Sequence, residues 1–178
     1  IADIDLLVRR EELPEARKLL NTFGYYASFP HDEESLPKGN SSLNTLVYSK
    51  PNEIYFVHLH WHIVNSTWPL DSLAARIDME RIWVSAKPHT VCGVESVGLS
   101  NEHLVIYLAY HCFQHYFDRM SSLFDLLKAI EAYTHEIDWD RLIDEAGAFG
   151  VVFVLYYCFY YSHTRLNYYV PAIERLRL

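Results

Sequence analysis

The residues best suited to chemistry in this sequence lie on two short segments that resemble β-strands. The first segment, IADIDLLV (residues 1–8), places Asp3 and Asp5 on one side of an extended chain, because successive side chains of a strand point to opposite faces. Two carboxylates at this spacing repel one another, and burying them without a partner costs free energy. A divalent metal ion is the simplest cation that would offset both effects.

The second segment, YFVHLHWHI (residues 55–63), has histidine at every other position. In a strand this alternation places His58, His60 and His62 on one face. If the two segments are neighbouring strands with their polar faces aligned, Asp3, Asp5 and at least His58 line one site. The alternative is that these histidines form the solvated face of an antiparallel sheet, which normally has one wet side.

The elements that position these segments alternate between strand and helix up to about residue 97. The first strand precedes an amphipathic helix, EELPEARKLLNTFGY, with Pro14 near its first turn and Gly24 as its stop. The remaining predictions are a loop over 30–42, a hairpin whose turn is Pro51–Asn52, a short helix over 69–78, and an edge strand with a turn over 89–98.

From Ser100 onward the sequence predicts only helices. Ser100 is a good N-cap for the run NEHLVIYLAYHCFQHYF, and Asp138 is a good N-cap for a later helix. The predicted fold class is therefore α+β. It has a small mixed β-sheet domain over residues 1–97, truncated at its N-terminus because the chain starts inside a strand pattern, followed by an all-helical domain over residues 98–178.

Composition narrows the function classes. The net charge is −8, from 15 basic and 23 acidic residues, which argues against broad nucleic-acid binding. The three cysteines are widely spaced and contain no C-x-x-C pair, so we expect neither a disulfide framework nor a zinc ribbon, and the cytoplasm is the expected compartment. A small phosphate ligand suits this charge better than a long polyanion.

The uncharged stretch over residues 149–164, FGVVFVLYYCFYYSHT, is a candidate for a membrane-spanning helix. It has 16 residues, fewer than the roughly 20 that a membrane-spanning helix needs, and it contains several tyrosines. We therefore predict a buried helix and no membrane association. Its aromatic cluster is expected in the core or at a subunit interface, and an exposed part of it would favour a homo-oligomer.

Six segments in this order resemble the uncharacterised nucleotidyltransferase family of the polymerase-beta-like superfamily. They are DIDLLV, a helix ending in GY, VHLHWHI, LSNEHLVIYLAYHCFQH, LFDLLKAI and IDWDRL. The resemblance implies a metal-dependent transfer of a nucleoside monophosphate from an NTP to an unknown acceptor, with release of pyrophosphate. It also implies that Asp3 and Asp5 are metal ligands, and carboxylate oxygens suit Mg²⁺ or Mn²⁺.

Two departures from the family pattern keep a second function open. Relatives carry a third acid where this chain has His58, although His60 and Trp61 match the pattern. The Gly-Ser turn that holds the triphosphate in the superfamily would precede Ile1. The catalytic set implied by the resemblance is thus Asp3, Asp5 and His58, and the alternative is a catalytically degenerate binding or regulatory module. A third hypothesis is a histidine-rich hydrolase or metal-binding protein.

The helical half adds further candidate polar residues. His103, Tyr107, His111 and His115 recur every four residues and form one stripe on the predicted helix. By the resemblance, His111, His115 and Asp125 match recurring polar positions of the family. Two interpretations stay open for them: a part in the site, or a structural hydrogen bond from His111 or His115 to Asp125 that joins neighbouring helices.

Overall fold

The computed structural model describes residues 3–28, 44–64, 71–117 and 119–176. The chain forms two compact units, Ile1–Ala75 and Arg76–Leu178, which we describe separately. A small mixed sheet lies in the first unit and most of the helices lie in the second, so the α+β prediction is confirmed. The loop predicted over 30–42 lies outside the described residues.

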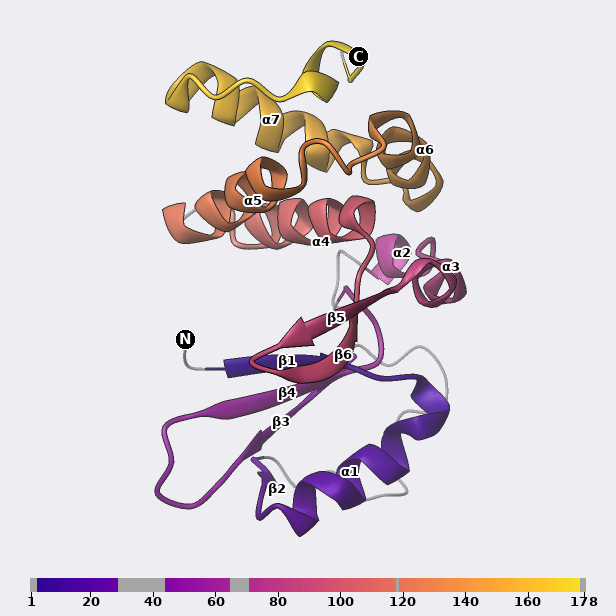
Figure 1. Ribbon diagram of the computed structural model, residues 1–178, viewed down its shortest axis with the longest axis vertical. Helices are drawn as coiled ribbons and strands as arrows, with labels where there is room; N and C mark the ends of the chain where they lie inside the picture. Colours follow the sequence, from indigo (N-terminus) through magenta and orange to yellow (C-terminus); the bar gives the residue numbers. More distant parts are fainter. Residues whose placement is uncertain (1–2, 29–43, 65–70, 118, 177–178) are drawn as a thin grey trace. The chain divides into compact units, whose positions relative to one another are not determined.

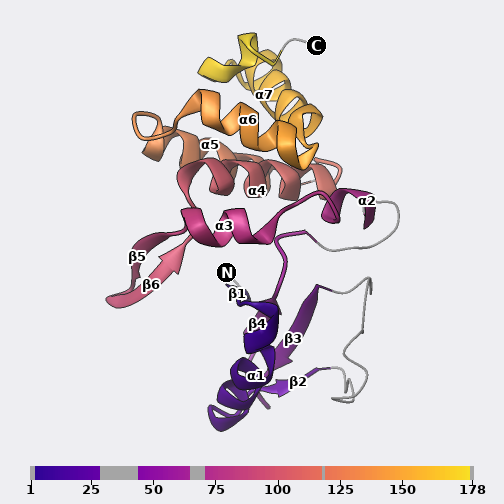
Figure 2. The same cartoon turned by 90° about the vertical axis from the view of Figure 1, so that its right-hand side faces the viewer.

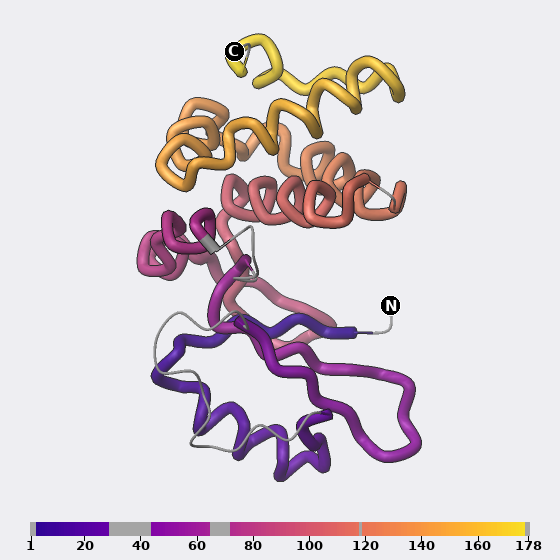
Figure 3. The backbone as a smooth tube through the Cα atoms, turned by 180° about the vertical axis from the view of Figure 1, so that it is seen from behind, coloured from indigo at the N-terminus to yellow at the C-terminus, as the bar shows by residue number. Residues whose placement is uncertain are grey.

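The first unit contains a four-stranded sheet with the order β1-β4-β3-β2 (Figure 1). The strands are β1 (Asp3–Leu7), β2 (Tyr26–Ala27), β3 (Thr45–Ser49) and β4 (Phe56–His60). Strand β1 pairs with β4 in parallel, whereas β3 pairs antiparallel with both β4 and β2. The β3–β4 hairpin predicted around the Pro51–Asn52 turn is therefore confirmed, and its connection can be followed in Figure 3.

One face of this sheet carries the core of the first unit. Helix α1 (Leu13–Thr22) follows a short 3-10 turn, η1 (Arg10–Glu12), and has Pro14 in its first turn. The helix ends before Gly24, whose φ of 79° is readily available only to glycine. The buried residues of the core are Leu13, Leu46, Tyr48, Val57, Leu59 and Trp61, and Ala16 and Leu20 of α1 pack against them.

Strand β1 is more exposed than its apolar sequence predicts. It is an edge strand of the sheet, and its register places Ile4 opposite Val57 and Leu6 opposite Leu59. Ile4 and Leu6 nevertheless remain 56% and 41% exposed. The apolar residues of this segment would suit a buried strand, but among the described residues β1 has a neighbouring strand on one side only. Its alternation, by contrast, is as predicted: Asp3 and Asp5 share one face.

The second unit is mainly helical (Figure 2). Its helices are α3 (Met79–Ser85), α4 (Asn101–Gln114), α5 (Met120–Tyr133), α6 (Trp139–Phe149), α7 (Val152–Leu166) and the 3-10 helix η3 (Pro171–Glu174). The predicted N-caps are confirmed, because the Ser100 side chain accepts a hydrogen bond from the His103 N–H and the Asp138 side chain accepts from two N–H groups of α6.

Two local predictions differ from the structure. The short helix predicted over 69–78 is seen as α2 (Asp71–Ala74), and α3 was not predicted. The segment predicted as one edge strand and turn forms a hairpin of β5 (Lys87–Val91) and β6 (Val94–Gly98). The two compact units divide between Ala75 and Arg76, which places α3 and this hairpin in the second unit. The domain boundary near residue 97 stays a prediction.

Helix α7 has a buried face and an exposed face. Val154, Leu155, Cys158 and Phe159 are buried, whereas Tyr157 and Tyr160 are about half exposed. The prediction of a helix here is confirmed, but only one side of the helix is buried. Among the described residues, no helix has both the length and the apolar character needed to cross a bilayer. Self-association through the exposed aromatic residues stays a prediction.

Candidate functional site

Two histidine side chains on β4 converge on one carboxylate oxygen of Asp5 on β1. Asp5 Oδ1 lies 3.0 Å from His60 Nε2 and 3.4 Å from His58 Nδ1. One ligand atom from each residue lies within 4.8 Å of the others. We call these residues the Asp5–His58–His60 cluster. Two imidazoles therefore face a single acidic oxygen on the sheet.

The backbone explains this convergence. The parallel register of β1 and β4 sets Asp5 directly opposite His58. His60 follows His58 by one strand repeat, so its side chain points to the same face and reaches back toward Asp5. Leu59, between the two histidines, points into the core on the opposite face and is fully buried. The alternation that fills the core therefore also aligns the two imidazoles.

The cluster is partly open to solvent. The side chain of Asp5 is 50% exposed, that of His58 30% and that of His60 19%. The two imidazole rings lie 6.1 Å apart, with an angle of 59° between their planes. A ligand can therefore reach the shared oxygen from outside while both imidazole rings are held on β4.

Asp3 and His62, which the alternation predicted on the same faces as Asp5 and His58, lie outside the cluster. Asp3 lies on the same face as Asp5, but it is exposed and opposite Phe56. Its neighbour on β4 is therefore a phenyl ring, which cannot bind a metal ion, instead of an imidazole. Strand β4 ends at His60, and His62 lies beyond it. The Val64 N–H donates to His62 Nδ1 at 3.0 Å. The prediction that three histidines share one strand face is therefore correct for two of them and wrong for His62.

The family pattern implies a divalent ion, and the side chains present fit one. Carboxylate oxygen and imidazole nitrogen are both established metal ligands. The donors that converge are one carboxylate and two imidazoles, whereas the resemblance implied ligation by the two aspartates. Asp3 stands one strand repeat from Asp5 and stays a predicted ligand. The structure thus places an imidazole, His58, beside Asp5 at the position where the resemblance implies a third acid.

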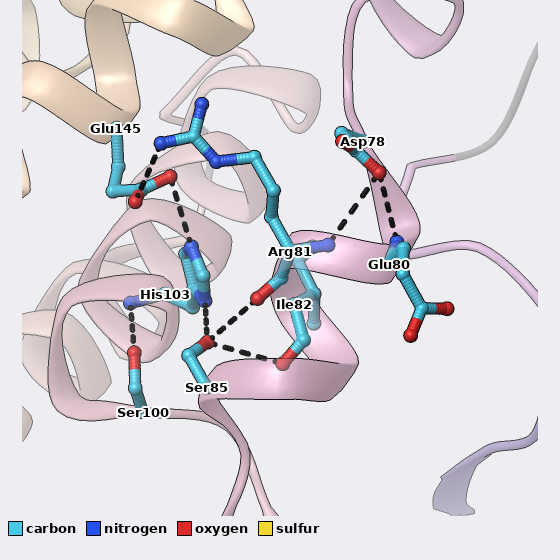
Figure 4. Close-up of polar contacts among 8 residues, drawn as sticks. All are labelled: Asp78, Glu80, Arg81, Ile82, Ser85, Ser100, His103 and Glu145. Atoms are coloured by element: carbon cyan, nitrogen blue, oxygen red, sulfur yellow. Dashed lines mark hydrogen bonds and ion pairs between the residues drawn. The ribbon is translucent and has the colours of Figure 1, made fainter.

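A second polar cluster lies inside the second unit and is centred on His103 (Figure 4). His103 Nδ1 lies 2.9 Å from Ser85 Oγ, and His103 Nε2 lies 3.4 Å from Glu145 Oε2. Arg81 donates to Glu145 Oε1 at 2.9 Å. The imidazole also stacks on Phe149, with ring centroids 5.6 Å apart. These contacts join α3, α4 and α6.

The order Ser–His–Glu resembles a catalytic triad, but its burial indicates a structural role. The Ser85 hydroxyl also donates to the carbonyl oxygens of Arg81 at 3.0 Å and Ile82 at 3.1 Å, so it is held within its own helix as well as against His103. Burial lowers the pKa of His103, opposed by the Glu145 carboxylate, so the neutral imidazole is favoured. His103 is 0% exposed, so no substrate can reach its ring without a rearrangement.

The sequence singled out His103 only as a member of a helical stripe. Its partners Ser85 and Glu145 are 18 and 42 residues away, and no local pattern links residues at such distances. The signal in the sequence was a histidine in the first turn of a helix capped by Ser100. Once such a histidine is buried, its ring nitrogens need hydrogen-bond partners.

The other candidates from the helical half also lie in the second unit. His111 lies on α4 and His115 just after it, and their rings meet edge to face with centroids 4.6 Å apart. The ring centroids of Tyr107 and His111 are 6.3 Å apart. Asp125 is exposed on α5. A hydrogen bond from either histidine to Asp125, and a part of these residues in a site, stay predictions.

Comparison with known proteins gives one match for the chain. A family model described as uncharacterised nucleotidyltransferase matches residues 1–167, which include both compact units almost entirely. Neither the curated proteins nor the solved structures include a match to this chain.

Proposed function

The chain belongs to the uncharacterised nucleotidyltransferase family, and we propose that it is a metal-dependent enzyme that transfers a nucleoside monophosphate from an NTP to an acceptor and releases pyrophosphate. The observation that carries the proposal is the contact of Asp5 Oδ1, on the strand with the D-x-D pattern, with both His58 and His60. A half-exposed acid held between two imidazoles is suited to an ion that a phosphate ligand also contacts.

The proposed roles follow from the positions of the side chains. Asp5, with Asp3 on the same strand face, would hold a divalent ion, Mg²⁺ or Mn²⁺. When bound, such an ion neutralises phosphate charge and stabilises the leaving pyrophosphate. We assign His58 to one of two roles: a ligand of the ion, or the base that takes a proton from the acceptor. His60, at 3.0 Å from Asp5, would hold that carboxylate in position and is within reach of the same ion.

In the proposed reaction, a nucleophilic atom of the acceptor forms a bond to the α-phosphorus of the NTP. The bond from that phosphorus to the oxygen that bridges to the β-phosphate breaks, and pyrophosphate leaves with the electron pair. The acceptor's proton passes to a base, for which His58 is the candidate. The net charge of −8 favours a small acceptor over a long polyanion.

A second candidate function is a catalytically degenerate binding or regulatory module. Two features favour it: the resemblance implies an acid at the position of His58, and Asp3 has Phe56 opposite it. An imidazole brings no negative charge, so the site holds less charge with which to bind Mg²⁺ than three carboxylates would. This module would bind a nucleotide without releasing pyrophosphate.

The test is a thermal-shift measurement on the full natural protein, combined with a pyrophosphate-release assay. Each of the four common NTPs is added with Mg²⁺ or Mn²⁺. We expect at least one NTP to raise Tm in the presence of the ion, and we expect Asp5→Asn to abolish the shift. Asp144→Asn, which changes an exposed acid on α6, is the matched control and should retain it.

The two candidate functions give different results. Pyrophosphate release that Asp5→Asn abolishes supports the enzyme and overturns the degenerate module. A thermal shift with no pyrophosphate release from any NTP supports the module. The absence of any shift with all four NTPs and both ions would contradict nucleotide binding altogether.

A further inference from the structure

We infer that the Asp5–His58–His60 cluster is a binding site for a divalent ion of the first transition series, such as Mn²⁺, Co²⁺ or Zn²⁺, in preference to Mg²⁺. The inference rests on the proposed function for the role of the ion in nucleotide chemistry. The binding of the ion itself depends only on the three side chains.

The distances in the cluster match those between ligands of one ion. Ligands about 2.1 Å from a common ion lie about 3.0 Å apart at a right angle and about 3.4 Å apart at a tetrahedral angle. Asp5 Oδ1 lies 3.0 Å from His60 Nε2 and 3.4 Å from His58 Nδ1. All three ligand atoms fall within 4.8 Å of one another, and the two imidazole nitrogens need to lie within about 4.2 Å of each other to share one ion with bonds of about 2.1 Å.

The chemistry of the donors decides which ion is preferred. Mg²⁺ takes oxygen ligands in a strict octahedral arrangement, usually from carboxylates, phosphates and water. Imidazole nitrogen instead suits the borderline ions of the transition series. Two of the three converging atoms are imidazole nitrogens, and one is a carboxylate oxygen. The additional acid that would favour Mg²⁺, Asp3, lies opposite Phe56 and outside the group.

The framework of the cluster is already in place. His58 and His60 are anchored on a strand whose intervening residue, Leu59, is fully buried. Asp5 is positioned by the backbone register. The half-exposed Asp5 side chain leaves the outer side of the ion open to water or a phosphate oxygen. The site would therefore bind the ion before any nucleotide arrives.

The experiment is metal titration of the full, tag-free protein after removal of metal with a chelator. Isothermal titration calorimetry compares Co²⁺ and Mg²⁺, and the visible absorption of bound Co²⁺ reports nitrogen ligation. We expect one Co²⁺ per chain, affinity for Co²⁺ at least 100-fold above that for Mg²⁺, and a loss of at least ten-fold in Co²⁺ affinity for His60→Gln and for Asp5→Asn. His135→Ala, which removes an exposed histidine after α5, is the matched control and should leave the affinity unchanged.

The outcomes separate this inference from the proposed function. Equal affinities for the two ions, or a Co²⁺ affinity that His60→Gln does not change, would overturn the inference. NMR of the imidazole resonances of the unmodified protein provides a test that needs no variant, since Zn²⁺ should perturb His58 and His60 first. Tight Co²⁺ binding without pyrophosphate release supports the ion site and counts against the enzyme. Pyrophosphate release supported by Mg²⁺ alone, without Co²⁺ binding, overturns the ion site and keeps the enzyme.

Discussion

His60 Nε2 and Asp5 Oδ1 lie 3.0 Å apart although 55 residues separate them along the chain. The parallel pairing of β1 and β4 creates this contact, because it sets Asp5 opposite His58 and brings His60 to the same face. A shift of one residue in this register would turn the carboxylate to the opposite face of the sheet. The cluster therefore depends on the register of two short strands.

The first prediction concerns His58, the residue directly opposite Asp5. His58→Asp places a second carboxylate directly opposite Asp5 and changes the donor set toward the oxygen ligands that Mg²⁺ prefers. We expect the ratio of Mg²⁺ affinity to Co²⁺ affinity to rise at least ten-fold. If the protein is a nucleotidyltransferase, pyrophosphate release supported by Mg²⁺ should rise as well. The measurements are calorimetry and the pyrophosphate assay.

The control for this prediction is His62→Asp. It makes the same chemical change two residues beyond the end of β4, where the side chain lies outside the Asp5–His58–His60 cluster. We expect it to leave the ratio of the two ion affinities within about two-fold. An equal rise in both variants would mean that added negative charge alone attracts Mg²⁺, and the direct ligand role of position 58 would be contradicted.

The sequence predicts part of this site because the period of a strand is fixed. Alternation places Asp3 with Asp5 and His58 with His60 without any knowledge of tertiary structure. Alternation does not tell which acid meets the histidines, because that depends on the register between two strands about 50 residues apart. It also extends the strand through His62, whereas β4 ends at His60.

The second prediction concerns the buried histidine of the second unit. His103→Ala removes the contacts to Ser85 and Glu145 and the stacking on Phe149, and it leaves a cavity. We expect the free energy of unfolding to fall by about 2–4 kcal/mol, as for other large-to-small changes that also break buried hydrogen bonds. Equilibrium unfolding in urea measures this change.

The control is His163→Ala on α7, which removes an exposed histidine. We expect it to change the free energy of unfolding by less than about 0.5 kcal/mol. Equal effects of the two substitutions would contradict the view that His103 joins α3, α4 and α6.

The third prediction is the pH dependence that His103 causes. Burial lowers its pKa from the ordinary value of 6.5, against the opposing effect of Glu145. The unfolded chain therefore binds more protons at this residue than the folded chain does as the pH falls below 6.5. Its contribution to stability is complete above that pH and is lost as the pH falls toward the folded pKa.

The measurement for this prediction is urea unfolding at several values between about pH 7 and about pH 5, in the range where histidine titrates. The free energy of unfolding should fall on acidification, and it should fall less steeply in His103→Gln. Glu102 adds a loss of the same sign at lower pH: burial raises its pKa, but a hydrogen bond from the Asp138 N–H and other contacts lower it overall. The same slope in both proteins would contradict the assignment to His103.

The fourth prediction concerns the three thiols. Cys112 and Cys158 are buried at 1% and 0% exposure, whereas Cys92 is exposed in the β5–β6 turn. The contact with the Cys112 thiol, together with burial, raises the pKa of Cys158, which further suppresses its reactive thiolate. We expect a thiol reagent to modify one cysteine per folded chain and three after unfolding in urea. Rapid modification of more than one cysteine in the folded protein would contradict the burial of the α4–α7 thiol pair.

The helices of the second unit were more predictable than the strands of the first. Ser100 and Asp138 mark helix starts through their own side chains, so the signal is local. Helix α3 was missed even though Asp78 caps it in the same way, because only seven residues follow and their apolar pattern is short. The exposure of β1 could not be predicted, since its apolar residues do not reveal that it lies at a sheet edge.

The fifth prediction concerns the turn that joins β5 to β6. Cys92 and Gly93 have φ angles of 50° and 81°, the combination that a two-residue hairpin turn with both central residues left-handed requires. Asparagine tolerates this conformation better than other residues with a side chain, and valine tolerates it poorly. We expect Cys92→Asn to raise the free energy of unfolding by about 0.5 kcal/mol and Cys92→Val to lower it by about 1 kcal/mol. Urea unfolding together with hydrogen exchange of the β5 and β6 amides measures both variants. Because Cys92 is exposed, a change of packing contributes little, and a valine variant as stable as the asparagine variant would contradict the left-handed conformation of this residue.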